Sequence, residues 1–275
     1  MRIISWNLLN GGQDNGGCHR LDRAVEIVRA CEADLVFFQE ARNFDAHDQR
    51  LLKDVGQRLR LAGFLSTADS GYHVAAFARH ELAATCTRFG RPDFFHALIS
   101  LRIALANGGV LHTLGAHWCP DSPDVRLTEA VNLLKLVRDD EQTLVIGDLN
   151  SPDPHADHTL AVADMRPRVR ARYLASDGSG TVDARALERL ESAGLVDVGR
   201  LRGSTGHTLP TPLPVPGAAF PQLRLDYFYA TARLAAGITD YRVLRNAETD
   251  EISDHYPVVV DLDVSRIGLT TAESP

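Results

Sequence analysis

The apolar residues of the chain fall into short runs that alternate with longer segments in which apolar side chains recur at every third or fourth position. Short runs rich in β-branched and aromatic residues are typical of strands, and the longer recurrence is typical of amphipathic helices. Strands are predicted at Arg2 to Trp6, Asp34 to Gln39, Val74 to Arg79, Ile99 to Leu105, Val110 to Ala116, Thr143 to Gly147, Leu225 to Ala230, Tyr241 to Leu244 and Pro257 to Leu262. Helices are predicted at Leu21 to Cys31, Asp48 to Leu61, Val125 to Arg138 and Ala184 to Ala193. This mixture predicts an α+β fold built on sheets.

A turn sequence, Asn107-Gly108-Gly109, lies between two of the predicted strands. A short glycine-containing turn joins antiparallel neighbours, so the sheet is not purely parallel. Because the chain shows neither a repeat nor a clear linker, we expect one domain over 1–264 and a C-terminal tail over 265–275.

Two segments, 151–183 and 203–222, lack a regular pattern. Irregular segments of this length in a folded domain are usually functional or mobile. The first segment carries arginine at alternate positions, including Arg166 and Arg168, which we take as candidate substrate-binding residues. The alternation is compatible with a phosphate-binding surface and also with an exposed strand face rich in arginine, and both interpretations stay open.

Polar residues whose side chains can bind a metal ion or transfer a proton lie directly before or after many of the predicted strands. A single aspartate or asparagine at a strand end is usually a turn former. Here the pattern repeats along the whole chain, at Asn7, Glu40, His117, Asp148 with Asn150, Asp226 and Asp254 with His255. Because the rim of a sheet can hold such groups without burying unpaired charge, we expect these side chains to form one site.

The chemistry of this set points to a hard cation. Carboxylate and amide oxygens suit Mg²⁺, Mn²⁺ or Ca²⁺ better than Zn²⁺, and the four scattered cysteines form no zinc-binding pattern. Clustered carboxylates also repel one another unless a cation or a histidine lies among them. We therefore expect a divalent metal, with Mg²⁺ or Mn²⁺ as the cofactor.

The order and spacing of these residues resemble a known family. The motifs Trp6-Asn7, Gln39-Glu40, His117, Gly147-Asp148-Leu149-Asn150, Leu225-Asp226-Tyr227 and Ser253-Asp254-His255-Tyr256-Pro257 resemble, in that order, those of the endonuclease/exonuclease/phosphatase superfamily. That group includes deoxyribonuclease I-like nucleases, abasic-site endonucleases, neutral sphingomyelinases and inositol-polyphosphate phosphatases. The resemblance implies a four-layer α/β/β/α sandwich of two mixed sheets with helices on both outer faces.

The resemblance also implies roles on the metal side of the site. Glu40 would be the principal metal ligand, Asn7 would add a neutral oxygen, and Asp254 would complete the metal environment. Asp148 would orient and deprotonate the attacking water, and Asn150 would hold a phosphate oxygen or the metal shell.

The histidines would act on the phosphoryl group. His255 would face the phosphoryl oxygens as an imidazolium, and Asp226 would bind its other ring nitrogen and keep it protonated. His117 resembles the second histidine of the nuclease and sphingomyelinase branches, which assists the leaving group or the phosphate oxygens.

One position departs from the family pattern. His73 stands where the family often has glycine, next to Tyr72, which would line the cleft, and both are candidate substrate-binding residues. A bulky ring at His73 would reshape the pocket, so the substrate of a relative does not transfer directly.

The net charge bears on the substrate. The chain carries 29 basic and 36 acidic residues, a formal charge of −7, and this balance does not favour binding of a polyanion over a broad face. Nucleic acid is therefore a possible but not a favoured partner beside a small phosphorylated metabolite. We find no membrane-spanning run and no secretory signal, and we expect a cytoplasmic protein.

Two functions are compatible with this chain. The first is a metal-dependent phosphoesterase that cleaves a phosphodiester or phosphomonoester by in-line attack of water. The second is a non-catalytic phosphate- or metal-binding module on the same fold. Sequence alone leaves open the substrate, the number of metals and the oligomeric state.

Overall fold

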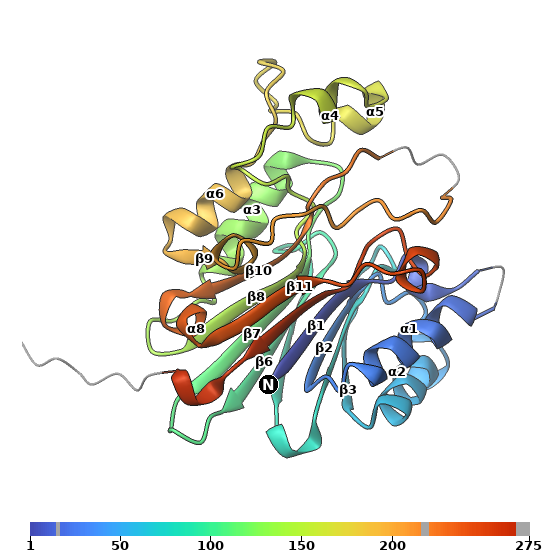
Figure 1. Ribbon diagram of the computed structural model, residues 1–275, viewed down its shortest axis with the longest axis vertical. Helices are drawn as coiled ribbons and strands as arrows, with labels where there is room; N and C mark the ends of the chain where they lie inside the picture. Colours follow the sequence, from blue (N-terminus) through green and yellow to red (C-terminus); the bar gives the residue numbers. More distant parts are fainter. Residues whose placement is uncertain (15–16, 216–219, 268–275) are drawn as a thin grey trace, which may run out of the picture.

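The computed structural model describes residues 1–14, 17–215 and 220–267, which form two six-stranded sheets packed face to face (Figure 1). The first sheet has the order β11 (Ile238–Val243), β12 (Val258–Leu262), β1 (Arg2–Asn7), β2 (Leu35–Gln39), β4 (Val74–Ala78) and β3 (Ala62–Ser66). The second has the order β5 (Thr85–Phe89), β6 (Ala97–Ala104), β7 (Val110–His117), β8 (Gln142–Asp148), β10 (Asp226–Thr231) and β9 (Leu195–Asp197).

Both sheets are mixed. The pairs β1–β2 and β7–β8 are parallel, and the other pairs are antiparallel. The turn at Asn107 joins β6 to β7, as its sequence predicts: Leu105 N–H donates to Gly109 O at 2.8 Å, and the Asn107 side chain accepts from Gly109 N–H at 3.0 Å. The expectation that the sheets are not purely parallel is confirmed.

Helices cover the two outer faces (Figure 1). The first sheet is covered by α1 (His19–Ala30) and α2 (Ala46–Leu59), and the second by α3 (Pro123–Leu134) and α6 (Arg185–Ser192). This arrangement confirms the predicted four-layer α/β/β/α sandwich. Shorter helices are α4 (Thr159–Ala163), α5 (Pro167–Arg170), α7 (Val198–Leu201) and α8 (Ala232–Gly237), with 3-10 turns at Asn10–Gly12, His80–Leu82, Thr249–Glu251 and Val264–Arg266.

The alternation of side chains along each strand builds the core. On β1, Ile3 lies between the sheets, whereas Ile4 packs outward against α1 and α2. The sheets approach closely at Gly115, because a Cβ added there would lie 2.4 Å from the Phe37 ring of the facing sheet. A glycine in the middle of β7 thus allows the large ring to pack at the centre of the sandwich.

One feature differs from the sequence-based expectation, and another lies partly outside the described residues. The arginine-rich part of segment 151–183 is not a strand, because Pro167 begins α5 and the residues after it continue in turns. The interpretation as an exposed strand face is therefore wrong. Ile267 is buried in the core between the sheets, and the rest of the predicted tail, 268–275, lies outside the described residues. The division into a domain and a tail stays a prediction.

No helix among the described residues is both long enough and apolar enough to cross a membrane.

Candidate active site

The predicted site residues come together at one rim of the sandwich. In the second sheet, His117 pairs with Asp148 and Asp148 pairs with Asp226, so the three side chains sit on neighbouring strand ends. In the first sheet, Asn7 pairs with Gln39, and Glu40 follows directly. A cavity of about 410 Å³ opens between these strand ends, and its lining includes Glu40, His117, Asp148, Asn150, Asp254 and His255.

Gly147 sets the end of β8. Its φ is 139°, and an added Cβ would lie 2.0 Å from the carbonyl oxygen of Ala116 on the neighbouring strand. Only glycine can bring the two backbones this close with that φ. The glycine of the G-D-x-N motif thus determines where Asp148 leaves the sheet.

Asp148 is held by hydrogen bonds to both of its oxygens. Asn7 Nδ2 donates to Oδ2 at 3.0 Å, and the backbone N–H of Asn150 donates to Oδ1 at 3.0 Å. Burial raises the pKa of the Asp148 carboxyl, and the nearby charge of His255 lowers it. The carboxylate is therefore fixed in place and has a higher proton affinity than an exposed aspartate, as a general base needs.

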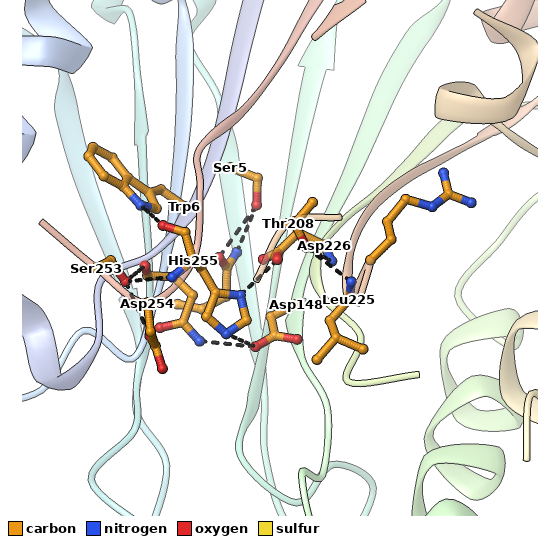
Figure 2. A network of polar contacts seen from close by, with 12 residues as sticks. Ser5, Trp6, Asp148, Thr208, Leu225, Asp226, Ser253, Asp254 and His255 are labelled. Atoms are coloured by element: carbon orange, nitrogen blue, oxygen red, sulfur yellow. Dashed lines mark hydrogen bonds and ion pairs between the residues drawn. The ribbon is translucent and has the colours of Figure 1, made fainter. Parts of the chain in front are cut away.

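His255 lies between two carboxylates (Figure 2). Its Nδ1 is 2.7 Å from Asp226 Oδ2, and its Nε2 is 3.8 Å from Asp148 Oδ2. Burial alone would lower the pKa of His255, but the carboxylates of Asp226 and Asp148 raise it well above its ordinary value. His255 is thus an imidazolium at neutral pH. The backbone of Asp226 is itself held in place, because its N–H donates to Thr208 Oγ1 at 3.1 Å.

The loop that carries His255 is fastened to β1 (Figure 2). Ser253 Oγ donates to the carbonyl oxygen of Asn7 at 2.6 Å, and Trp6 Nε1 donates to the carbonyl oxygen of His255 at 2.8 Å. Thr211 N–H donates to the carbonyl oxygen of Asp254 at 3.1 Å. The S-D-H motif is therefore anchored to β1 and to the loop at Thr211, and the position of its side chains follows from these backbone anchors.

Glu40 and Asp254 form the other part of the cavity wall. Glu40 Oε2 accepts from Asn10 N–H at 2.8 Å, and its Oε1 lies 3.4 Å from Asn7 Nδ2. Burial raises the pKa of Glu40, and the Asp254 carboxylate raises it further. Within 1–14, 17–215 and 220–267, neither carboxylate forms an ion pair with a lysine or an arginine. Two neighbouring carboxylates that are not paired with a lysine or arginine in the described part of the chain fit a divalent metal ion.

A second set of ligand atoms belongs to Asp148, Asp226 and His255. These atoms lie within 4.8 Å of one another, which is close enough to hold an ion. In this set, however, the imidazolium of His255 already supplies a positive charge between the two carboxylates. We therefore consider Glu40 and Asp254 the better-suited ligands.

Comparison with known proteins agrees with this geometry. A profile of the Endonuclease/Exonuclease/phosphatase family matches residues 4–255. The chain belongs to this family. Among curated proteins, none matches the chain.

Solved structures show the same fold at low sequence identity. An AP endonuclease from Archaeoglobus fulgidus has a TM-score of 0.69 at 20% identity, covering 96% of this chain and 99% of its own. A truncated TDP2 of Caenorhabditis elegans has a TM-score of 0.65 at 16% identity, with 94% and 96% covered. The 3'-5' exonuclease NExo of Neisseria meningitidis has a TM-score of 0.64 at 18% identity, with 96% and 100% covered. These likenesses establish the endonuclease/exonuclease/phosphatase fold.

Asn7 takes an orientation that the sequence could not specify. Its Nδ2 faces Asp148 and Glu40, and its Oδ1 accepts from Leu9 N–H at 3.0 Å. In this arrangement Asn7 donates to both carboxylates, so its role as a neutral oxygen ligand of the metal stays a prediction.

His117 lies at the site in an unexpected pairing. Its Nε2 is 3.6 Å from Asp148 Oδ2, and its ring stacks on His96 with centroids 4.3 Å apart and planes 19° apart. Burial lowers the pKa of His96 to about 4 and that of His117 well below its ordinary value. Both rings are therefore neutral at pH 7. Sequence reasoning missed His96, which precedes β6 at the same rim.

The predicted substrate-binding residues do not all reach the cavity. Tyr72 lines it, but His73 is buried behind it, where Nδ1 accepts from Ala68 N–H at 2.9 Å and Nε2 lies 2.9 Å from Asp45 Oδ1. Arg166 and Arg168 are exposed at α5 and do not line the cavity. Arg172 and Tyr173, which follow α5, do line it, as do Phe95, His96, Leu209 and Phe220.

Proposed function

We propose that the protein is a divalent-metal-dependent phosphoester hydrolase. The proposal rests on one observation: Glu40 and Asp254, which pair with no lysine or arginine among the described residues, share a cavity with Asp148 and the imidazolium of His255. The first pair suits a hard cation, and the second suits proton transfer and stabilisation of negative charge.

Each group then has a role in hydrolysis. Glu40 and Asp254 would hold Mg²⁺ or Mn²⁺, whose charge polarises the phosphoryl group. Asp148 accepts the proton of the attacking water, because its oxygens are fixed and its proton affinity is raised by burial. His255 donates from Nε2 to the phosphoryl oxygens as negative charge develops on them.

The neighbouring groups support these roles. Asp226 holds His255 Nδ1 and so keeps the imidazolium oriented. Asn150 lines the cavity, and its backbone N–H orients Asp148. His117, which is neutral, lies 3.6 Å from Asp148 and can accept or donate one hydrogen bond on the side of the leaving group.

Two substrate classes remain: nucleic acid and small phosphorylated metabolites. The names of two solved relatives, an AP endonuclease and a 3'-5' exonuclease, favour nucleic acid. The formal charge of −7 does not, and Arg172 is the only lysine or arginine among the described residues that line the cavity. The salt dependence of binding to single- and double-stranded DNA separates the two classes, because a flat slope excludes phosphate neutralisation as the source of affinity.

The activity is tested with Glu40→Ala and His255→Ala on a generic phosphodiester in Mg²⁺. Loss of one charge-stabilising group costs about 10²- to 10³-fold in rate, and we expect at least 10²-fold for each variant. Glu81→Ala, an exposed carboxylate far from the cavity, is the control and keeps full activity. Near wild-type turnover in Glu40→Ala and His255→Ala would contradict the proposed hydrolytic site.

Metal binding is tested separately by calorimetric titration with Mg²⁺ and Mn²⁺. We expect binding in the wild type and its loss in Glu40→Ala. Binding of metal and phosphate without turnover of any phosphoester would favour a non-catalytic binding module.

A further inference from the structure

Helix α3 carries two fully buried charged residues, Arg126 and Glu129, that face the strand ends of the site and have no role in the proposed hydrolysis. Charged side chains are rarely buried to this extent unless their partners require them. The partners here are backbone groups of the loops that line the cavity.

Glu129 joins two of these loops. Its Oε1 accepts from Phe95 N–H at 2.8 Å, and its Oε2 accepts from Cys119 N–H at 2.8 Å. Phe95 precedes His96, and Cys119 lies two residues after His117. One carboxylate therefore connects the two segments that carry the stacked imidazoles.

Arg126 extends the connection to a third segment. Its Nη1 donates to the carbonyl oxygen of Cys119 at 3.0 Å, and its Nη2 donates to that of Arg172 at 2.7 Å. Its guanidinium also lies 5.9 Å from the centre of the Tyr173 ring. Arg172 and Tyr173 both line the cavity, so α3 holds this part of the cavity wall through the backbone of three residues, Phe95, Cys119 and Arg172.

We propose that Glu129 is a positioning residue of the active site, which sets the separation of the two segments bearing His96 and His117 and thereby the wall on the side of the leaving group. The two donors are the backbone N–H groups of Phe95 and Cys119, and a single side chain supplies an acceptor to each of them. A carboxylate is the only side-chain group of this size with two acceptor oxygens, which gives a reason to keep a buried charge there. Burial raises the pKa of Glu129 to about 7, and the two N–H groups favour its charged form.

The test is Glu129→Gln, because glutamine has the same shape but only one acceptor oxygen. One of the two bonds is lost, an N–H of Phe95 or Cys119 faces an amide NH₂, and the stack of His96 on His117 changes. The matched control is Glu141→Gln at the opposite rim, where the carboxylate is also largely buried and accepts from Arg102 Nε at 3.0 Å.

The kinetic measurement rests on the proposed function. We expect Glu129→Gln to lower kcat about tenfold or more while KM changes less than about threefold, because displacement of a catalytic group acts mainly on the chemical step. His96→Ala should lower kcat similarly, and the double variant should lose little more, since both changes disturb the same wall. Glu141→Gln keeps the wild-type kcat.

A second measurement does not depend on activity. In NMR spectra of histidine-labelled protein, Glu129→Gln should shift the ring signals of His96 and His117, whose positions depend on their stacking, and Glu141→Gln should leave them unchanged. If the wild type hydrolyses no phosphoester, the proposed function fails, and this spectrum still decides the role of Glu129.

Unshifted ring signals together with wild-type kcat in Glu129→Gln would overturn the inference. If this variant does not fold, amide hydrogen exchange of the wild type decides. Slow exchange at both Phe95 and Cys119 supports the double bond to Glu129, whereas fast exchange at either one contradicts it.

Discussion

The two rims of the sandwich carry carboxylates at equivalent strand ends but surround them differently. At the rim away from the cavity, Asp261 and Glu141 are each paired with an arginine. Arg2 Nε lies 2.7 Å from Asp261 Oδ1 across β1 and β12, and Arg102 Nε lies 3.0 Å from Glu141 Oε1. Arg2 and Arg242 hold the pKa of Asp261 below its ordinary value, so this charge stabilises the fold at neutral pH.

At the cavity rim, Glu40, Asp148 and Asp254 make no contact with an arginine among the described residues. Burial raises the pKa of Glu40 and Asp148, which means that the folded protein disfavours their charged forms. In the part of the chain that the structure describes, the positive side chain in contact with this cluster is the imidazolium of His255.

The comparison shows that the same strands meet two different requirements at their two ends. Carboxylates that are paired with an arginine contribute to stability, and their oxygens are not available to a ligand. Unpaired ones cost stability but attract a cation and a water molecule. Substitutions that remove a carboxylate should therefore act in opposite ways at the two rims.

The largest effect is expected for Glu40→Gln. Removal of the charge weakens the metal ligand that we propose at this position, so activity should fall about 10²- to 10³-fold. Unfolding temperature without metal should stay the same or rise, because the repulsion between Glu40 and Asp254 is relieved. Phosphodiester turnover measures the activity of the variant, and thermal unfolding with and without Mg²⁺ measures its stability. A clear loss of metal-free stability would contradict the comparison.

Much of the fold was predictable because the central strands are apolar on both faces. The strands that the sequence did not reveal, β3, β5 and β9, all lie at sheet edges. β5 has no buried residue, β3 is partly exposed and includes Gly63, and β9 has only three residues, so the apolar pattern of each is weak. The edge position of these strands, which tertiary packing creates, cannot be read from local sequence.

The site was predictable to the extent that its residues directly follow central strands. Asn7, Glu40, His117 and Asp148 all end strands at one rim, so the fold brings them together. His96 was missed because the predicted strand began at Ile99, whereas β6 begins at Ala97, directly after His96. The antiparallel β6 begins at the rim where β7 ends, so His96 lies beside His117.

Other assignments depended on contacts that no local pattern encodes. His73 also precedes a strand, yet its ring nitrogens are taken by Ala68 N–H and by Asp45. The arginine alternation gave no means of distinguishing Arg172, which lines the cavity, from Arg166, which does not.

The next largest effect is expected for Asp226→Asn. The amide removes the carboxylate that holds His255 Nδ1 at 2.7 Å, and loss of an orienting partner of this kind costs about 10- to 100-fold. Metal binding should be unchanged, because Glu40 and Asp254 are untouched. Turnover in Mg²⁺ and calorimetric titration of the metal give the two results. Full activity in this variant would show that His255 needs no partner.

A smaller effect concerns acid stability at the opposite rim. Burial and the charge of Arg102 lower the pKa of His112 to about 4, although Glu141 raises it in part. From the ordinary value of about 6.5 down to about 4, the unfolded chain therefore takes up a proton that the folded protein does not. Stability should fall with decreasing pH across this window, by at most about 1.4 kcal/mol per pH unit.

This slope is isolated by comparison with His112→Asn, which cannot titrate there. The unfolding free energy of the variant, from urea titrations between pH 4 and pH 7, should depend less on pH than that of the wild type. Equal slopes for the two proteins would show that His112 takes up its proton at the same pH in the folded protein as in the unfolded chain.

The smallest effect is expected for Glu141→Gln at neutral pH. Arg102 loses its carboxylate but is partly exposed, so water replaces much of the interaction and the loss is about 1 kcal/mol. For a domain of this size, that corresponds to a decrease of about 2 °C in unfolding temperature. Turnover should stay at the wild-type level. Because Glu40→Gln should do the reverse at the other end of the same sandwich, a loss of activity in Glu141→Gln would mean that the two rims are coupled through the strands.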